Sequence, residues 1–291
     1  SGLYHLHDLL RDLARPDDAA RARHAHTALA LASEANAAYK QGRVQEALAR
    51  FDVLWPHLQA AWAWMRTRDD PAAQQWLRDF GWDFIYLLDL RTTPAERIPY
   101  LQAARALGDK RAEGALLGAL GLAYAALGRV EDAIEHYRQA LAIAREIGDR
   151  RGEGNRLGNL GNAYADLGRV EEAIEHYQQA LAIAREIGDR RNEGAWLGAL
   201  GLAYAALGRV EEAIEHYQQA LAIAREIGDK RNEGIHAWNL GLAYEKLGDC
   251  ARAAEWMQIL VDYERAIGHP DAEKHAQHLA QVRARTEQGD C

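Results

Sequence analysis

The clearest pattern in the chain is an apolar stripe that advances in steps of three and four residues. It is most regular between residues 130 and 147, at Val130, Ala133, Ile134, Tyr137, Ala140, Leu141, Ala144 and Ile147. That spacing predicts a helix with one buried face. The stripe returns in copies that begin at Gly108, Gly148, Gly188 and Gly228, a constant spacing of 40 residues. A fixed period in this range is the signature of a stacked repeat protein.

Each copy also holds a helical segment before the stripe. A candidate N-cap opens this segment at Asp109, Asp149, Asp189 and Asp229. A Leu-Gly turn ends it at Gly128, Gly168, Gly208 and Gly248. The pattern therefore predicts two antiparallel helices per repeat. Because the apolar surface is shared between neighbours, one isolated repeat is not expected to fold.

Glycines within the first helix indicate close packing. Gly121, Gly161, Gly201 and Gly241 recur there, although glycine costs about 1 kcal/mol relative to alanine inside a helix. We expect them to face Ala133, Ala173, Ala213 and Ala253, so that the two helices of a repeat touch. We expect Tyr124, Tyr164, Tyr204 and Tyr244 between the helices, and Tyr137, Tyr177 and Tyr217 against the next repeat.

The flanking segments are less regular. Residues 1–15 hold one short amphipathic helix, and residues 16–107 predict two irregular helix pairs, with helices at 19–39, 45–65, 71–90 and 94–107. Pro56 should kink or interrupt the second of these, and Thr93 should cap the last, with Pro94 at its first position. Residues 108–267 form four repeats, namely 108–147, 148–187, 188–227 and 228–267. Residues 268–291 are expected to form a capping helix and a tail.

The spaced residues of each repeat resemble the signature of the tetratricopeptide repeat. In the first repeat the matching residues are Leu117, Leu120, Gly121, Tyr124, Gly128, Ala133, Tyr137 and Ala140. The resemblance implies an all-α fold, a right-handed superhelix of antiparallel helix pairs. The fourth repeat departs from it, with Met257 in place of Tyr and Leu260 in place of Ala, and is expected to terminate the array. The 40-residue form resembles the repeats of Pins-type spindle adaptors and of bacterial STAND signalling proteins.

Charge and composition narrow the partners. The chain has 35 Lys+Arg and 43 Asp+Glu, a formal charge of -8, and the charges are interspersed. No basic stripe is present, so nucleic acid is not an expected partner. No run of about 18 apolar residues and no signal peptide occurs, so we expect a cytoplasmic protein that does not bind membranes. Ser1-Gly2 is typical of a remnant of tag removal.

Chemical motifs are sparse, so we expect neither an enzyme nor a cofactor in this chain. It contains no phosphate-binding loop, nucleophile elbow or paired metal-ligand motif. His136, His176 and His216 recur at the repeat period, and neighbouring helices lie about 10 Å apart, too far for one metal ion. Cys250 and Cys291 lack metal-ligand spacing and are expected to be ordinary thiols. Trp55, Trp62, Trp64, Trp76 and Trp82 are expected to fill gaps in the irregular packing rather than to form a ligand cage.

The expected binding surface is the concave face, lined by the first helices of the repeats. The family's groove positions carried onto this sequence give Leu122, Asn155, Asn159, Asn162, Asp166, Leu202, Trp238, Asn239, Leu242 and Lys246. Asparagine both donates and accepts hydrogen bonds, so Asn159 and Asn162 could hold the main chain of an extended peptide. The resemblance to Pins-type adaptors implies the same contact. The alternative is that these asparagines are merely solvated.

The N-terminal stretch carries a second resemblance. Leu6-His7-Asp8-Leu9-Leu10-Arg11 resembles the end of the winged-helix domain of NB-ARC-type STAND NTPases. The resemblance implies that His7, within a triplet that includes Asp8, senses ADP in a larger protein. ATP and ADP would then bind an upstream domain, and oligomerisation would run through that NTPase.

Three hypotheses follow. The favoured one is the partner-sensing, autoregulatory region of a STAND-type ATPase, whose array binds a protein or peptide ligand. The alternative is a free-standing scaffold that binds extended peptides in its groove. A third concerns origin: residues 118–150 and 198–230 differ only at Asp132/Glu212, Arg138/Gln218 and Arg150/Lys230. The array has therefore expanded recently or been idealised, and its groove could be generic.

Overall fold

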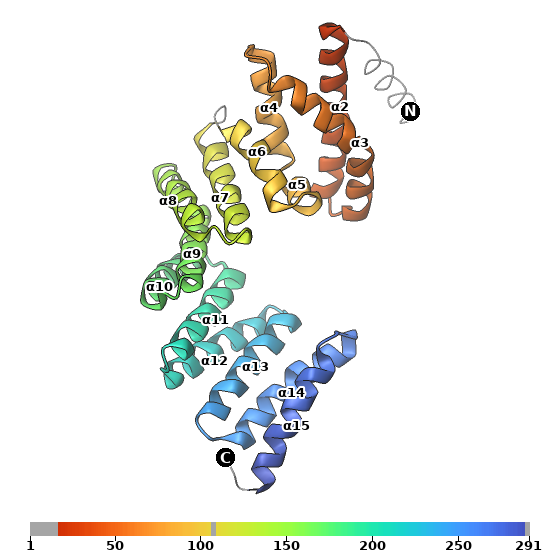
Figure 1. The fold of residues 1–291 in the computed structure, drawn as a ribbon. Coiled ribbons are helices and arrows are strands. Elements are labelled where there is room, and N and C mark those ends of the chain that lie inside the picture. The colour runs from red at the N-terminus through yellow and green to blue at the C-terminus, as the bar shows by residue number, and fades with distance from the viewer. Residues whose placement is uncertain (1–16, 106–108, 289–291) are drawn as a thin grey trace. The chain divides into compact units, whose positions relative to one another are not determined.

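The predicted helix pairs are present in the computed structural model, which describes residues 17–105 and 109–288. Within those ranges all regular secondary structure is helical, in 14 helices (Figure 1). The chain divides into two compact units, Ser1–Ile147 and Gly148–Cys291. The all-α solenoid fold predicted from the sequence is confirmed.

The N-terminal unit contains seven of these helices and includes the first regular repeat. They are α2 (Asp18–Lys40), α3 (Val44–Met65), α4 (Pro71–Asp83), α5 (Ile85–Arg91), α6 (Pro94–Arg105), α7 (Lys110–Ala126) and α8 (Val130–Glu146). The main antiparallel contacts here are α2 with α3 and α7 with α8.

The C-terminal unit contains the other regular repeats. Its helices are α9 (Arg150–Asp166), α10 (Val170–Glu186), α11 (Arg190–Ala206), α12 (Val210–Glu226), α13 (Lys230–Lys246), α14 (Cys250–Ile267) and α15 (Ala272–Gln288). Consecutive pairs pack against each other, and each second helix also packs against the following first helix. α15 packs on α14 in the same way and buries Leu279 and Val282.

Local signals set the helix ends of the repeats. Asp189 Oδ1 accepts the backbone N–H of Asn192 at 3.2 Å, and the other three aspartates cap their helices alike. The turn at Gly208 has φ of 75°, in the left-handed region that favours glycine. The predicted caps and turns are confirmed.

The glycines of the first helices do allow close packing, but against different atoms from those expected. A Cβ on Gly201 would lie 2.6 Å from Cδ1 and 2.9 Å from Cζ of Tyr217. Gly121 and Gly161 likewise face the rings of Tyr137 and Tyr177. The atoms nearest to these glycines thus belong to the tyrosine rings of the second helix, and not to the alanines expected there.

Gly241 is an exception among these glycines. The position opposite it holds Met257, and a Cβ on Gly241 would lie 2.6 Å from Met257 Cγ and 2.9 Å from the Ala253 carbonyl oxygen. Here the expectation that the glycine faces alanine holds in part. Met257 is fully buried, so the methionine fills the space that tyrosine fills in the other repeats.

The irregular helices of the N-terminal unit pack around an aromatic core. Phe51, Phe80 and Phe84 are fully buried in it. The expected helix from residue 71 to residue 90 is wrong: it ends at Asp83, because Phe84 leaves the helical region with φ of -103° and ψ of 11°. Pro56 does not interrupt α3, which runs unbroken from Val44 to Met65 while the proline lies exposed on its surface. The predicted cap of α6 is confirmed, since Thr93 Oγ1 accepts the Glu96 N–H at 3.3 Å.

Candidate functional site

One side of α9, α11 and α13 carries most of the residues predicted to bind a partner. We call it the first-helix face and define it by residues 155, 159, 162 and 166 on α9, 195, 199 and 202 on α11, and 235, 239, 242 and 246 on α13. The opposite side of each helix is buried; on α9, for example, it includes the buried residues Leu160 and Tyr164. Helical periodicity therefore turns the face away from the core.

Asn155 lies at the N-terminal end of this face and is held by the next repeat. Its Oδ1 accepts a hydrogen bond from Nδ2 of Asn192 at 3.0 Å. The same Nδ2 group donates to Oδ2 of Asp189 at 3.2 Å. Asp189 is the N-cap of α11, so the cap of one helix also orients a side chain on its neighbour.

Asn162 is exposed on the same face, and a tyrosine of α10 contacts it from the protein side. Its Oδ1 accepts a hydrogen bond from the hydroxyl of Tyr177 at 2.8 Å. Tyr177 is buried on α10, and burial, together with the charge of Asp166, raises the pKa of its phenol to about 12. The phenol therefore remains protonated at neutral pH. Asn159 lies half-buried between the two other asparagines.

The α11 and α13 parts of the face are more apolar. The side chains of Leu202 and Leu242 are 55% and 40% exposed. Asn239 is half-buried beside them, and Lys246 Nζ lies 3.5 Å from the carbonyl oxygen of Ala205. Two exposed leucines at equivalent positions of successive repeats supply apolar area on this face that a partner could cover.

Two further predicted residues have distinct surroundings. Trp238 is half-buried, and its ring lies 4.5 Å from the ring of His275 and 5.6 Å from that of His278, both on α15. Leu122 is 51% exposed on α7 and belongs to the N-terminal unit.

The joints between repeats contain ion pairs that sequence reasoning missed. Glu193 is only 7% exposed, and its carboxylate accepts hydrogen bonds from Arg185 at 3.0 Å and from Arg190. Glu233 repeats the arrangement with Arg225 at 2.9 Å and Lys230 at 2.8 Å. The detectable signal was a basic residue three positions before a glutamate at each helix start. These contacts join adjacent repeats and give the first-helix face a defined frame.

The recurring histidines also pack within the repeats. His176 stacks on Tyr164 with ring centroids 5.1 Å apart, and the guanidinium of Arg169 lies 4.7 Å from the same tyrosine ring. His216 stacks on Tyr204 at the same distance. In the part of the chain that the structure describes, no group of three acidic, His or Cys side chains could hold a metal ion.

The model of one family, the tetratricopeptide repeat, matches residues 112–186, 153–226 and 192–258. Together these matches run from residue 112 to residue 258, half of the chain. The chain belongs to the tetratricopeptide repeat family. Members of this family bind protein or peptide partners, and the fold is generally non-catalytic. No curated protein matches the chain.

Solved structures share the tetratricopeptide fold at low identity. BtubC (BKLC) from P. vanneervenii is 18% identical, the alignment covers 91% of each chain, and the TM-score is 0.54. A putative kinesin light chain from Podosopora anserina, with nearly identical TPR-like repeats, is 23% identical over 69% of this chain and 97% of that chain, with a TM-score of 0.52. A Rap protein complexed with Competence and Sporulation Factor is 14% identical over 92% of this chain and 76% of its own, with a TM-score of 0.55.

The tryptophans before the regular tetratricopeptide repeats belong largely to packing. Trp55 and Trp62 contact the ring of Tyr100 edge-on at 5.7 and 4.8 Å, and the Trp76 indole donates to the carbonyl of Ala25 at 2.9 Å. Trp82 is partly exposed. The interpretation of these rings as packing residues is supported for Trp55, Trp62 and Trp76.

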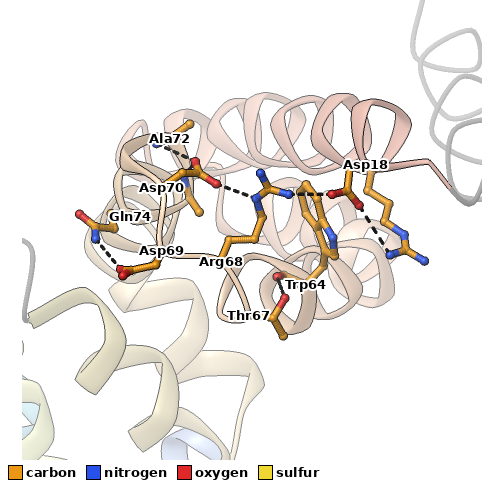
Figure 2. A network of polar contacts seen from close by, with 10 residues as sticks. Asp18, Trp64, Thr67, Arg68, Asp69, Asp70, Ala72 and Gln74 are labelled. Atoms are coloured by element: carbon orange, nitrogen blue, oxygen red, sulfur yellow. Dashed lines mark hydrogen bonds and ion pairs between the residues drawn. The ribbon is translucent and has the colours of Figure 1, made fainter.

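Trp64 takes part in a polar network at the junction of α2, α3 and α4 (Figure 2). The guanidinium of Arg68 lies 4.7 Å from the centroid of the Trp64 ring and donates to Asp70 at 2.7 Å and to Asp18 at 3.1 Å. Asp70 also caps α4, and the backbone N–H of Ala73, followed by Arg68, lowers the pKa of its carboxyl. This network ties the start of α2 to the α3–α4 turn.

His7 and Asp8, which the resemblance implies take part in nucleotide sensing in a larger protein, lie outside the described residues. Cys250 is disulfide-bonded, so the expectation of an ordinary thiol there is wrong.

Among residues 17–105 and 109–288, no helix is long and apolar enough to cross a bilayer.

Proposed function

We propose that the first-helix face of α9, α11 and α13 binds an extended peptide segment of a protein partner. The observation that carries the proposal is the combination of exposed Leu202 and Leu242 with Asn162 at the matching position of α9, where Asn155 and Asn159 lie on the same face. The leucines supply apolar area, and the amides supply hydrogen bonds to a peptide main chain. Family membership supports this role, because tetratricopeptide repeats bind protein or peptide partners.

The departures from exact repetition also support this location. The repeat of α9 has Asn155, Asn159 and Asn162 where the repeat of α11 has Ala195, Ala199 and Leu202. The remainder of these repeats is almost unchanged, as the identical second helices α10 and α12 illustrate. A substitution of small or apolar residues by three amides on one face changes its binding chemistry without changing the fold.

A displayed library of random twelve-residue peptides tests the proposal. The most enriched peptide would be labelled with fluorescein and its affinity measured by fluorescence anisotropy. Asn159→Ala should weaken binding about fivefold, because one net hydrogen bond contributes about 1 kcal/mol. Gln179→Ala, an exposed change on the second helix α10, is the matched control. Equal affinities for the two variants and the unchanged protein would place the site elsewhere.

The wider role that we propose is the sensor region of a STAND-type ATPase. Its support is the similarity of Leu6–Arg11 to the end of an NB-ARC winged-helix domain. Partner binding would release the ATPase only if the active state binds the partner more tightly than the ADP-bound state does. The gene sequence upstream tests this: a missing P-loop and acidic partner strand would end the hypothesis. If the upstream sequence does encode a P-loop domain, the partner peptide should stimulate ATP turnover by the whole protein.

The alternative is a free-standing scaffold without an attached enzyme. A separate hypothesis concerns origin: the near-identity of residues 118–150 and 198–230 indicates an array that expanded recently or was idealised, and its groove could be generic. The sensor and scaffold hypotheses share the peptide-binding face and differ in the gene context, so the upstream sequence separates them.

A further inference from the structure

We infer that Asn155 and Asn162 are each held in one amide orientation, so that the α9 part of the first-helix face presents N–H donors. The inference rests on the proposed function and deepens it. A face of N–H donors takes carbonyl or carboxylate oxygens, so the partner is an extended peptide that turns its carbonyl edge toward α9. Asn192 and Tyr177 are the positioning residues.

The orientation of Asn155 follows from a chain of three side chains. An ionised carboxylate carries no proton and can only accept hydrogen bonds, and Asp189 Oδ1 already accepts the backbone N–H of Asn192 at the cap. The group of Asn192 that lies 3.2 Å from Asp189 Oδ2 must therefore be the NH₂ group. That same NH₂ group lies 3.0 Å from the Asn155 amide, which must offer its oxygen in return. Asn155 thus keeps its own NH₂ group for a partner.

The orientation of Asn162 follows from the phenol behind it. The Tyr177 hydroxyl donates to Asn162 Oδ1 at 2.8 Å, so the amide oxygen faces the protein. Asp166 lies four residues further along the same helix face, where its negative charge favours the NH₂ side of the amide. With its oxygen occupied from the protein side, Asn162 also offers an NH₂ group outward.

The next repeat contains residues equivalent to Asn192 and Tyr177, but no asparagines at the positions of Asn155 and Asn162. Asn232 Nδ2 donates to Asp229 Oδ2 at 2.8 Å, as Asn192 does to Asp189, but Ala195 occupies the position of Asn155. Tyr217 is buried like Tyr177, with Leu202 at the position of Asn162. Equivalents of Asn192 and Tyr177 thus occur one repeat further along, where no asparagine lies at the position that they would orient. This gives each positioning residue a matched control in the same protein.

The first experiment measures affinity for the enriched, fluorescein-labelled library peptide. Asn192→Ala and Tyr177→Phe should each weaken binding three- to tenfold, whereas Asn232→Ala and Tyr217→Phe should change it less than twofold. Asn155→Asp replaces the outward NH₂ group by an acceptor of the same size and should weaken binding more than tenfold. Ala195→Asp adds the same charge in the next repeat and should have the smaller effect.

The second experiment needs no peptide. In ¹⁵N-labelled free protein, the side-chain NH₂ signal of Asn155 should shift in Asn192→Ala and stay in place in Asn232→Ala. The signal of Asn162 should respond in the same way to Tyr177→Phe and not to Tyr217→Phe. A general loss of stability would not separate the members of these pairs, so this readout reports orientation.

The outcomes distinguish a failure of the proposed donor orientation from a failure of the proposed peptide-binding function. If Asn159→Ala weakens binding while Asn192→Ala and Tyr177→Phe behave like their controls, the peptide site stands and the donor orientation is overturned. If the asparagine signals do not respond in the free protein, the orientation is overturned without reference to any peptide. If no selected peptide depends on Asn159, the proposed function itself fails.

Discussion

The glycine in the middle of each first helix offers a direct test of how the repeats pack. Gly201 lies within α11 and faces the ring of Tyr217 on α12, which is 2% exposed. The perturbation is Gly201→Ala, the addition of one methyl group at this contact. Helix propensity and packing make opposite predictions for its effect on the free energy of unfolding.

The structure decides which effect is larger. Alanine is favoured over glycine inside a helix by about 1 kcal/mol, so propensity alone predicts stabilisation. The added Cβ would lie 2.6 Å from Cδ1 and 2.9 Å from Cζ of Tyr217, well inside the roughly 3.5–4.0 Å of normal carbon contact. Overpacking of this kind costs about 1–3 kcal/mol, and several overlapping ring atoms place it in the upper part of that range. We therefore expect a net destabilisation of about 1–2 kcal/mol.

Guanidinium chloride unfolding followed by circular dichroism measures the effect. Ala199→Gly in the same helix is the matched control, because it reports the propensity difference without the tyrosine contact. The double variant Gly201→Ala/Tyr217→Leu removes the ring and should show a favourable coupling of about 1 kcal/mol or more. Repeat arrays can unfold in more than one step, so midpoints should be compared together with a nearest-neighbour model.

The result that refutes this reasoning is a higher midpoint for Gly201→Ala than for the unchanged protein. In that case the tyrosine ring yields without cost, and the recurring glycine has another cause. A lower midpoint that persists unchanged in the Tyr217→Leu background would likewise show that the ring is not the reason.

Two further predictions concern charged contacts. Glu233→Gln should lower the stability at neutral pH by about 1 kcal/mol, since it weakens charged hydrogen bonds from Lys230 and Arg225, whose side chains are both exposed to solvent. These hydrogen bonds, that from Lys230 first, lower the pKa of Glu233, so their stabilisation is present above the ordinary value of about 4.3 and is lost as the pH falls through the lowered pKa. Unfolding midpoints measured from pH 7 to acid should converge for the two proteins, and a constant gap would contradict the prediction. Arg68→Ala should leave the midpoint of thermal unfolding almost unchanged, because its bond to Asp70 is partly solvent-exposed; a clear drop in the midpoint would contradict this prediction.

The regular helices could be predicted from the sequence because their signals are local. Asp189 and Gly208 bond or bend within a few residues of their own position, and the apolar stripe reports helical periodicity directly. Irregular segments were less predictable. The break at Phe84 falls three residues after Gly81, but a single glycine inside a helical pattern does not locate a helix end; Phe84 leaves the helix while its ring lies 6.0 Å from that of Phe51, far away in sequence.

The candidate site was located by position, but its chemistry was not visible in the sequence. Asn155 and Asn162 were identified as groove residues from their register in the repeat. That their oxygens are occupied by Asn192 and Tyr177 depends on contacts between residues 37 and 15 positions apart. Trp238 was predicted from the same register, yet its ring contacts α15. Register places a side chain on a face and cannot say which neighbour reaches it.

The repeat family, the helix pairs and the ends of the regular helices can therefore be derived from the amino-acid sequence alone, because the helical apolar pattern, the caps and the turn glycines act over less than one repeat. The folded chain is needed to tell which atoms fill the space at Gly201, which cations neutralise Glu193, and which way the amide of Asn155 points. Each of these depends on side chains from another helix, and in two of the three cases from the adjacent repeat. Packing between helices is therefore where near-identical repeats become chemically different surfaces.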